Sequence, residues 1–363
     1  MTNPLQRRPT QDGRHTPNLW PVWLVAPGAL LIVGAAAFSL YHGAELLLSS
    51  ENTGNKPIKV QDVISTTVTV LTLIGAVLAA LYAYRKQLLD EGTSHRADAT
   101  QLTERYTKAA EQLGHEQPAV RLTGVYAMAR LADYWPEQRQ VCVDVLCAYL
   151  RMPYETDSTE PGFRHGEREV RFTIIRIIRS HLLDPTSITT WCGLGLDFTG
   201  ATFDSGHFMA ATFSGEVSFS GATFSGGEVY FSGARFSGGG FYFSGAAFSG
   251  GQVDFSVSTF SGGEVYFSGA TFSGGEVDFS GSTYTSGEVS FDVSIYSGGQ
   301  VSFDGSNFSG AQVNFSGSAF SGGEVSFNGS TYSGDTVSFE YLLIQPAAAI
   351  RWGPFPAIPV NQP

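Results

Sequence analysis

The sequence predicts a mixed fold, in which two transmembrane helices and a small α-helical segment precede a solenoid of stacked β-strand repeats. Three observations support this prediction. Two uncharged apolar stretches, residues 20–40 and 63–84, lie near the N-terminus. Residues 93–183 carry apolar side chains at helical spacing. A twelve-residue repeat then runs from Val217 to about residue 340, and such self-similarity is typical of stacked arrays.

Composition and charge exclude several classes of protein. The 363 residues include 21 Lys+Arg and 33 Asp+Glu, so the formal net charge is -12, which argues against a basic nucleic-acid binder. Three cysteines are too few for a disulfide framework, and an aromatic content of 13% argues against a disordered acidic chain. The acidity belongs to residues 196–340, where 14 Asp+Glu face the single Arg235, a net charge of -13.

Each apolar stretch is long enough to cross the ~30 Å hydrocarbon layer of a bilayer. Three arginines precede the first stretch and three cations follow the second, whereas the intervening loop has two lysines. The positive-inside rule then predicts a cytoplasmic tail (1–19), a helical hairpin (20–84) with an outer loop (43–62), and both termini in the cytoplasm at the inner membrane. The alternatives are two buried helices, or a cleaved signal peptide in place of the first span.

The middle segment, 93–183, is predicted to be α-helical and cytoplasmic. Its first helix ends at Gly114, a second covers Pro118–Tyr134, a third begins at Pro136, and a fourth covers Val170–Leu183. We expect four arginines to form a solvated helix face or to meet acidic lipid headgroups or the acidic repeats: Arg121, Arg130, Arg139 and Arg151. Three histidines are expected at the surface: His115, His165 and His181.

No residue pattern in this segment predicts catalysis or metal binding. Cys142 and Cys147 lie five positions apart, which is not a zinc-ligand spacing, so we expect them in the core. The chain also contains no P-loop, dinucleotide-binding glycine pattern, HExxH or GxSxG motif. We therefore predict no enzymatic activity, no cofactor, and no catalytic, cofactor-binding or metal-binding residue.

Each twelve-residue unit divides into five, five and two residues. The fives read V-x-F-S-G and A/S-x-F-S-G, and the aromatic residue and the residue two before it point to the same side of an extended strand. These positions should therefore line an interior. The predicted structural core comprises Phe198, Phe203, Phe208, Phe213, Phe219, Phe224, Phe231, Phe236, Phe243, Phe248, Phe255, Phe260, Phe267, Phe272, Phe279, Phe291, Phe303, Phe308, Phe315, Phe320, Phe327 and Phe339.

Residues 196–340 resemble a pentapeptide-repeat protein. The resemblance implies a right-handed quadrilateral β-helix with an inward Leu or Phe at the centre of each five. The stretches LTERYTKAAEQLG, VRFTIIRIIRSHL and LDFTGATF, together with the apolar spans, also resemble membrane-anchored pentapeptide-repeat proteins of actinobacteria, most of which have no assigned function. This chain differs in its aromatic centres and in the dipeptide after every second five. A coil should then consist of two twelve-residue units, with a bulge at alternate corners.

A coil of two units predicts which side chains stack on the outside. Glu228, Glu276 and Glu324 would form an acidic column suited to interactions, with Gln252 and Gln300 between them reducing like-charge repulsion. The exposed far end of a solenoid needs a cover. We expect residues 341–363, with the Pro-rich tail around Trp352, to form this C-terminal cap.

These features predict a non-catalytic membrane-anchored scaffold, whose rigid acidic prism offers its faces to protein partners at the cytoplasmic membrane face. The expected partners are the lipid bilayer and an unidentified protein, with no direct nucleic-acid contact, and the faces also allow a homo-oligomer. One alternative is a DNA mimic that binds a topoisomerase or another nucleic-acid-binding protein. The other, if the topology is reversed, is an extracellular adhesive or surface repeat protein.

Overall fold

The computed structural model describes residues 60–333 and 337–359, together with residues 31, 34, 35, 38, 39, 41–43 and 46. The chain divides into two compact units, Met1–Asp98 and Ala99–Pro363. The predicted tail (1–19) lies outside the described residues, and the first span (20–40) and the outer loop (43–62) lie mostly outside them. The structure therefore leaves the two-helix hairpin as an expectation.

Helix α2 (Val60–Leu113) is the main element that the structure describes in the first unit. Its segment Val68–Gln87 is the one stretch of the described residues with the length and apolar composition needed to cross a membrane. The helix runs without interruption from the predicted second span (63–84) through residues 85–92 into the predicted helical segment that begins at residue 93. The helix contains no proline, which would break it, and a single glycine such as Gly92 costs only about 1 kcal/mol relative to alanine.

Three further α-helices follow in the second unit. They are α3 (Pro118–Tyr134), α4 (Arg139–Arg151), preceded by the short 3₁₀ helix η1 (Pro136–Gln138), and α5 (Glu167–His181). The bounds of α3 coincide with the predicted ones, and prolines begin both α3 and η1. The helices pack through apolar side chains such as Val125, Leu146 and Ile174, which are fully buried.

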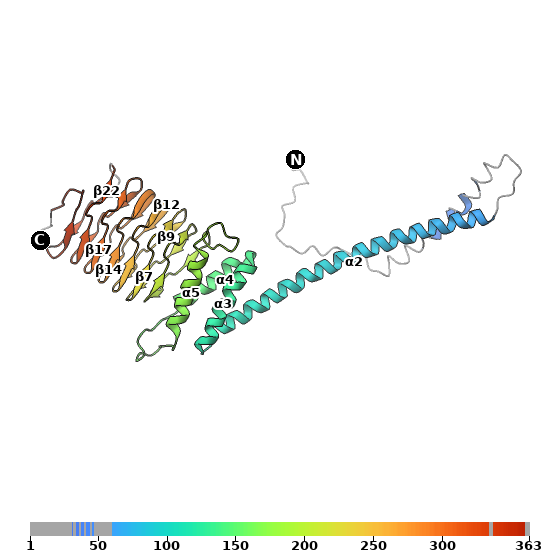
Figure 1. Cartoon of the computed structure of the whole chain (residues 1–363), viewed down its shortest axis with the longest axis horizontal. Helices are drawn as coiled ribbons and strands as arrows, with labels where there is room; N and C mark the ends of the chain where they lie inside the picture. The colour runs from blue at the N-terminus through green and yellow to red at the C-terminus, as the bar shows by residue number, and fades with distance from the viewer. Residues whose placement is uncertain are drawn as a thin grey trace, which may run out of the picture. The chain divides into compact units, whose positions relative to one another are not determined.

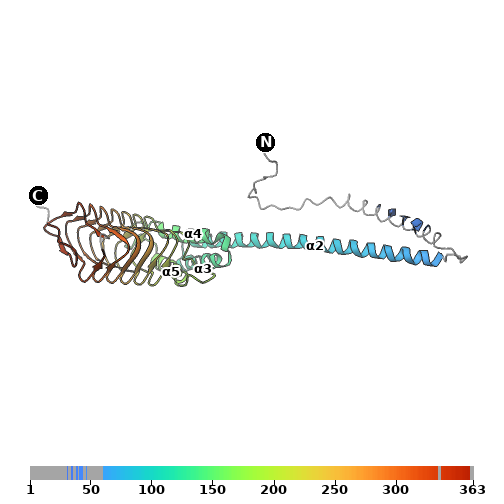
Figure 2. The same cartoon turned by 90° about the horizontal axis from the view of Figure 1, so that it is seen from above.

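The repeat region forms a right-handed-type β-solenoid of about six turns. Its short parallel strands make four ladders, which we call the first to fourth faces in chain order around a coil. Figure 1 shows the strands side by side, and Figure 2 shows the coils stacked behind one another. The predicted quadrilateral β-solenoid is thus confirmed, and the twelve-residue unit of the sequence is half of a coil.

Strands of the first and second faces alternate along the chain with those of the third and fourth. The first face contains β1 (Leu196–Asp197), β5 (Val217–Ser218), β9 (Gly240–Tyr242), the ends of β12 (Thr259–Tyr266) and β15 (Thr283–Ser290), β19 (Gln312–Asn314) and β23 (Val337–Ser338). The second face contains β2 (Thr202–Phe203), β6 (Thr223–Phe224), β10 (Ala247–Phe248), β13 (Thr271–Phe272), β16 (Ile295–Tyr296), β20 (Ala319–Phe320) and β24 (Leu343–Ile344).

The other two faces complete each coil. The third face contains β3 (Gly206–His207), β7 (Glu228–Tyr230), β11 (Gln252–Asp254), β14 (Glu276–Asp278), β17 (Gln300–Ser302), β21 (Glu324–Ser326) and β25 (Ala349–Arg351). The fourth face contains β4 (Thr212–Phe213), β8 (Arg235–Phe236), the beginnings of β12 and β15, β18 (Asn307–Phe308) and β22 (Thr331–Tyr332).

The strand register gives the length of each coil. Leu196 pairs with Val217, and this first coil is short because it consists of unbroken fives. From Val217 onward, partners such as Val217 and Phe241 are separated by two full twelve-residue units. The extra dipeptide therefore lengthens alternate corners, which is the bulge that the repeat pattern predicts.

Stacked aromatic rings fill the interior. Of the phenylalanines named above, all except Phe339 are at most 2% exposed, and Phe339 is half-buried. Rings in one column lie parallel, as for Phe231 and Phe255, whose centroids are 4.7 Å apart at an interplanar angle of 4°. Rings of neighbouring columns meet edge to face, as for Phe243 and Phe255 at 85°. Both geometries suit the quadrupoles of aromatic rings.

The corners are of two kinds. A tight corner follows the first and third faces, where the N–H of Ala246, for example, donates to the carbonyl of Phe243 at 3.0 Å. A glycine corner follows the second and fourth faces. There Gly251 has φ +69°, and a Cβ on it would overlap the carbonyl oxygen of Gly227 in the coil below. Only glycine fits where coils approach this closely.

Both ends of the solenoid are covered. At the first coil, the backbone N–H groups of Thr212 and Ser214 donate to the carbonyls of Leu182 and Cys192, so the segment after α5 satisfies the open strand edge. At the last coil, Phe355 is 6% exposed and packs edge to face on Phe327, with centroids 5.5 Å apart. The C-terminal tail therefore lies over the last aromatic layer.

Candidate interaction surfaces

The predicted acidic column lies on the third face. Strand register places Glu228, Gln252, Glu276, Gln300 and Glu324 directly above one another. Successive strands lie ~4.8 Å apart, so the carboxylates are separated by ~9.6 Å, about one Debye length at 0.1 M salt. Glu324 also forms an ion pair with Arg351, whose Nε lies 2.8 Å from its carboxylate, and this pair closes the column at its C-terminal end.

A second acidic column runs beside the first on the same face. Asp254 and Asp278 occupy neighbouring strands and are half-buried. Each carboxylate accepts a hydrogen bond from a backbone N–H two residues further on, that of Ser256 at 2.7 Å and that of Ser280 at 2.8 Å. These N–H groups give each carboxylate a local hydrogen-bond partner on neighbouring strands of the same face.

The opposite, first face carries a further acidic pair that sequence reasoning did not single out. Glu264 and Glu288 occupy neighbouring strands, with Gln312 above them. Desolvation, a hydrogen bond to Glu264 and the nearby carboxylates raise the pKa of Tyr266 to about 12. The signal was present in the sequence, since these acids also recur at a spacing of two repeat units.

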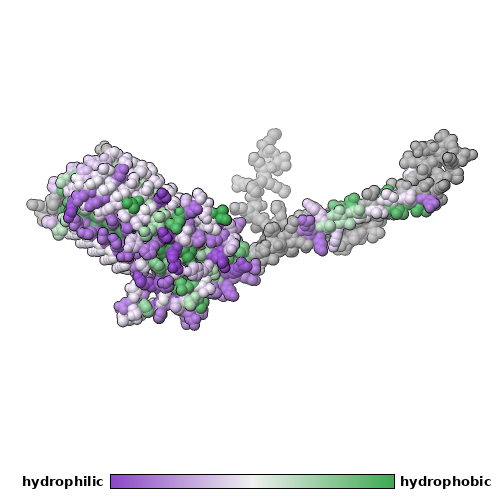
Figure 3. Space-filling model, viewed as in Figure 1, coloured by the Kyte–Doolittle hydropathy of each residue, from purple (hydrophilic) through white to green (hydrophobic). Residues whose placement is uncertain are grey.

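The second and fourth faces are almost free of charge. Among the described strands, their outward positions hold Thr202, Thr223, Ala247, Thr271, Ile295, Ala319 and Leu343 on the second face, and Thr212, Arg235, Thr259, Thr283, Asn307 and Thr331 on the fourth. Figure 3 shows mostly polar or neutral surface over the repeats, with scattered apolar residues. Charge is therefore segregated onto two opposite faces.

Inward serines replace alanine on the neutral faces without leaving an unpaired hydroxyl. The Oγ of Ser258 donates to the carbonyl of Phe231 at 2.9 Å, and that of Ser282 donates to Phe255 at 2.8 Å. Ser294, Ser306, Ser318 and Ser330 repeat this bond to the corresponding carbonyl of the preceding coil. Because each bond joins adjacent coils, the serines add polar ties inside an aromatic core.

The expected solvated arginine face is wrong for Arg121. This side chain is fully buried, donates to the carbonyls of Glu116 and His165 at 2.6 and 3.0 Å, and pairs with Glu167 at 3.3 Å. Arg151 pairs with Asp197 of the first coil, so it meets the acidic repeats, and Arg130 is exposed. Burial of this kind depends on tertiary packing and leaves no local sequence signal.

The surface position expected for His181 is also wrong. Its ring is half-buried, stacks on Trp191 with centroids 4.1 Å apart, and its Nε2 lies 3.1 Å from an oxygen of Asp133. His115 and His165 are exposed, as expected. The Asp133 contact joins α3 to the end of α5, two helices that the sequence alone could not bring together.

The cysteines are packed in the core, and their thiols are poor nucleophiles. Cys142, Cys147 and Cys192 are all at most 3% exposed. Burial raises the pKa of the Cys142 thiol to about 11 and that of the Cys147 thiol to about 12, so both stay protonated near neutral pH. Within the described residues, no group of three His, Cys, Asp or Glu side chains could hold a metal ion.

Comparison with known proteins supports the repeat assignment. The family model described as Pentapeptide repeats (9 copies) matches residues 198–242. The match covers the first two coils, where the fives are least interrupted by dipeptides. No curated protein and no solved structure matches the chain. The strand ladders continue to Arg351, so residues 198–242, which match the pentapeptide repeats, and the residues after them form one β-solenoid.

Proposed function

We propose that this chain is a non-catalytic, membrane-anchored pentapeptide-repeat protein of the actinobacterial type, whose solenoid is an interaction scaffold at the cytoplasmic membrane face. The observation that carries the proposal is the segregation of charge: two acidic faces alternate with two flat, nearly neutral ones. A partner can bury a neutral face while its basic residues meet the acidic ladders beside it. Pentapeptide-repeat solenoids are generally non-enzymatic.

Membrane anchoring is supported by the apolar segment Val68–Gln87 of α2 and by the sequence of the first apolar stretch. The cytoplasmic side is supported by the excess of Arg and Lys before the first stretch and after the second, compared with the loop between them. An anionic bilayer would also repel the acidic solenoid and keep its faces accessible.

Topology is the first test of this proposal. A single cysteine is placed after Pro363 in a chain lacking the three native cysteines, and intact cells are treated with a membrane-impermeant maleimide. We expect labelling only after lysis. Labelling of intact cells would contradict the cytoplasmic orientation and would favour a surface repeat protein.

Partner capture tests the scaffold itself. The parent chain and a variant with Glu228, Glu276 and Glu324 changed to Gln are crosslinked in native membranes and purified. We expect one or more proteins that the parent retains and the variant loses. A matched control, Glu104→Gln on the exposed part of α2, should keep them. If no protein depends on the solenoid, the scaffold function is wrong.

A further inference from the structure

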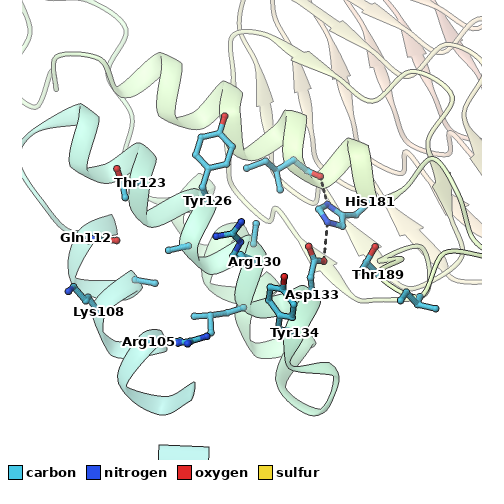
Figure 4. A pocket seen from close by; sticks show the side chains of 16 residues that line it. Arg105, Lys108, Gln112, Thr123, Tyr126, Arg130, Asp133, Tyr134, His181 and Thr189 are labelled. Carbon is cyan, nitrogen blue, oxygen red and sulfur yellow. Dashed lines mark hydrogen bonds and ion pairs between the residues drawn. The ribbon is translucent and has the colours of Figure 1, made fainter. Parts of the chain in front are cut away.

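A groove in the helical part of the second unit carries an unpaired positive charge. Its walls come from the end of α2, from α3 and from the end of α5 with the segment that follows, and its volume is about 1080 Å³. Figure 4 shows the side chains of Arg105 and Lys108 from α2 and of Arg130 from α3 among the residues that line it. The groove lies outside the solenoid and its acidic faces.

The cations of the groove have no acidic partner of their own. Arg105, Lys108 and Arg130 are exposed, and none of them forms an ion pair within the described part of the chain. The one carboxylate in the lining, Asp133, already contacts His181 at 3.1 Å. Three cations thus remain available to an anionic ligand.

Aromatic and apolar side chains share the remaining lining with the polar side chains of Gln112, Thr123, His181 and Thr189. Tyr126 and Tyr134 are 53% and 70% exposed, and Ile188 is 91% exposed. The floor contains the buried side chains Ala109 and Leu131. Arginine and tyrosine beside apolar surface are the residues most enriched at the centres of protein interfaces. Tyr126 is held in place by Arg176, whose Nη2 donates to its hydroxyl at 3.0 Å.

We propose that this groove binds an acidic peptide segment of a partner protein, with carboxylates on Arg105, Lys108 and Arg130 and an apolar side chain between Tyr126 and Tyr134. Charge complementarity selects an anionic occupant. Two features favour a peptide over a phosphate group: the cations are spread along two helices, and the groove has an apolar floor and room for several residues. A phosphate site would gather its donors around one point.

The test uses the full chain in detergent micelles and a library of labelled dodecapeptides that carry four glutamates among leucine and tyrosine residues. We expect library members to bind, with Kd raised at least about tenfold by the pair Arg105→Glu and Arg130→Glu. Binding should also weaken as NaCl rises from about 50 to 300 mM. The matched control Arg235→Glu, an exposed cation of the fourth face, should change Kd less than about twofold.

Parallel titrations with inorganic phosphate and with vesicles containing phosphatidylserine distinguish other anions. Binding of either one that depends on Arg105 and Arg130, with no peptide binding, would overturn the proposal, as would peptide binding that the paired variant leaves unchanged. A library in which no peptide binds would also overturn the proposal. The glutamine variant of Glu228, Glu276 and Glu324 should bind the peptides normally, so this result stands apart from failure of the solenoid scaffold.

Discussion

Two tyrosines inside the solenoid carry hydroxyl groups that no protein atom in the described residues satisfies. Tyr284 and Tyr296 occupy column positions that are phenylalanine in the coils below and above, and their hydroxyls are buried without a hydrogen-bond partner. Their rings still stack at 4.8 Å on Phe260 and Phe272. The aromatic ring thus fits the column while the hydroxyl is destabilising.

Changing both tyrosines to phenylalanine should raise the free energy of unfolding by about 1–3 kcal/mol, because two desolvated hydroxyls are removed and the ring packing is kept. Urea unfolding at neutral pH measures this. The control Tyr341→Phe, at a side chain that is 87% exposed, should leave stability unchanged. A less stable double variant would show that the hydroxyls have partners.

The same pair predicts a pH dependence. Burial holds the pKa of Tyr284 and Tyr296 well above 10.0, whereas in the unfolded chain both titrate near pH 10. Above about pH 10, ionisation of the two tyrosines therefore stabilises the unfolded state but not the folded state. The free energy of unfolding that is present below pH 10 falls as the pH rises beyond it. Between pH 9 and pH 11, the free energy of unfolding measured in urea should fall less for the phenylalanine variant than for the parent chain. Parallel declines in both chains would contradict the assignment.

One corner residue has the wrong backbone preference. Val257 has φ +50° and is 64% exposed, at a tight corner where the neighbouring coils use glycine, Gly233 and Gly281. A left-handed conformation costs a non-glycine residue roughly 1–2 kcal/mol. Val257→Gly should therefore stabilise by about 0.5–1 kcal/mol after the entropy of the unfolded glycine is subtracted. Thermal unfolding measures it, and the neighbouring Ser256→Gly, without positive φ, should destabilise.

Among the helices, a buried ion pair joins α3 to α5, and a buried arginine of α5 forms a hydrogen bond to the first coil. Arg121 pairs with Glu167 inside the helical core, and Arg171, 4% exposed, donates to the carbonyl of Thr202 in β2 at 3.1 Å. Arg151 and Asp197 instead pair at the surface. These two kinds of contact should differ strongly in energy, because a buried charge left without its partner cannot return to water.

Arg121→Ala should lower the free energy of unfolding by about 3–5 kcal/mol, since the carbonyls of Glu116 and His165 lose a donor and the buried carboxylate of Glu167 loses its buried cation. Arg151→Ala should cost at most about 1 kcal/mol, as is usual for exposed pairs. Urea unfolding followed by circular dichroism compares the two variants under the same conditions. Equal losses would mean that the burial of Arg121 does not govern its contribution.

For the molecule as a whole, the repeat pattern predicted the solenoid because every inward position recurs. The place of a residue such as Phe231 or Phe255 within its own repeat was enough to predict that its side chain is buried. The helix Pro118–Tyr134 was likewise predicted from neighbouring residues, namely the proline at its start and the spacing of its apolar side chains. The groove of Arg105, Arg130 and His181 could not be predicted, since it combines helices far apart in the chain. The charge segregation became visible only with a coil of two repeat units, which separates faces that look equivalent in a single unit.

The coil architecture predicts where the solenoid accepts a change in length. Phe203 and Phe224 are partners in adjacent coils, and the glycine corner that follows Phe224 is two residues longer than the corner that follows Phe203. The strands of the third face nevertheless pair, so this ladder accepts corners of different length. At the tight corners the bond from Ala246 to Phe243 recurs as Ala222 to Phe219 and Ala270 to Phe267. An added residue there would break this corner bond and would turn the next strand inside out.

Insertion of one glycine after Gly250, in a glycine corner, should therefore cost at most about 1 kcal/mol, as expected for a small change in loop length. Insertion after Gly245, in a tight corner, should cost about 3–5 kcal/mol, because Phe248 must leave the aromatic column or the strand must shift. Urea unfolding of both variants compares them at equal chain length and composition. Equal costs would show that the two kinds of corner do not differ in tolerance, and that the dipeptides have another role.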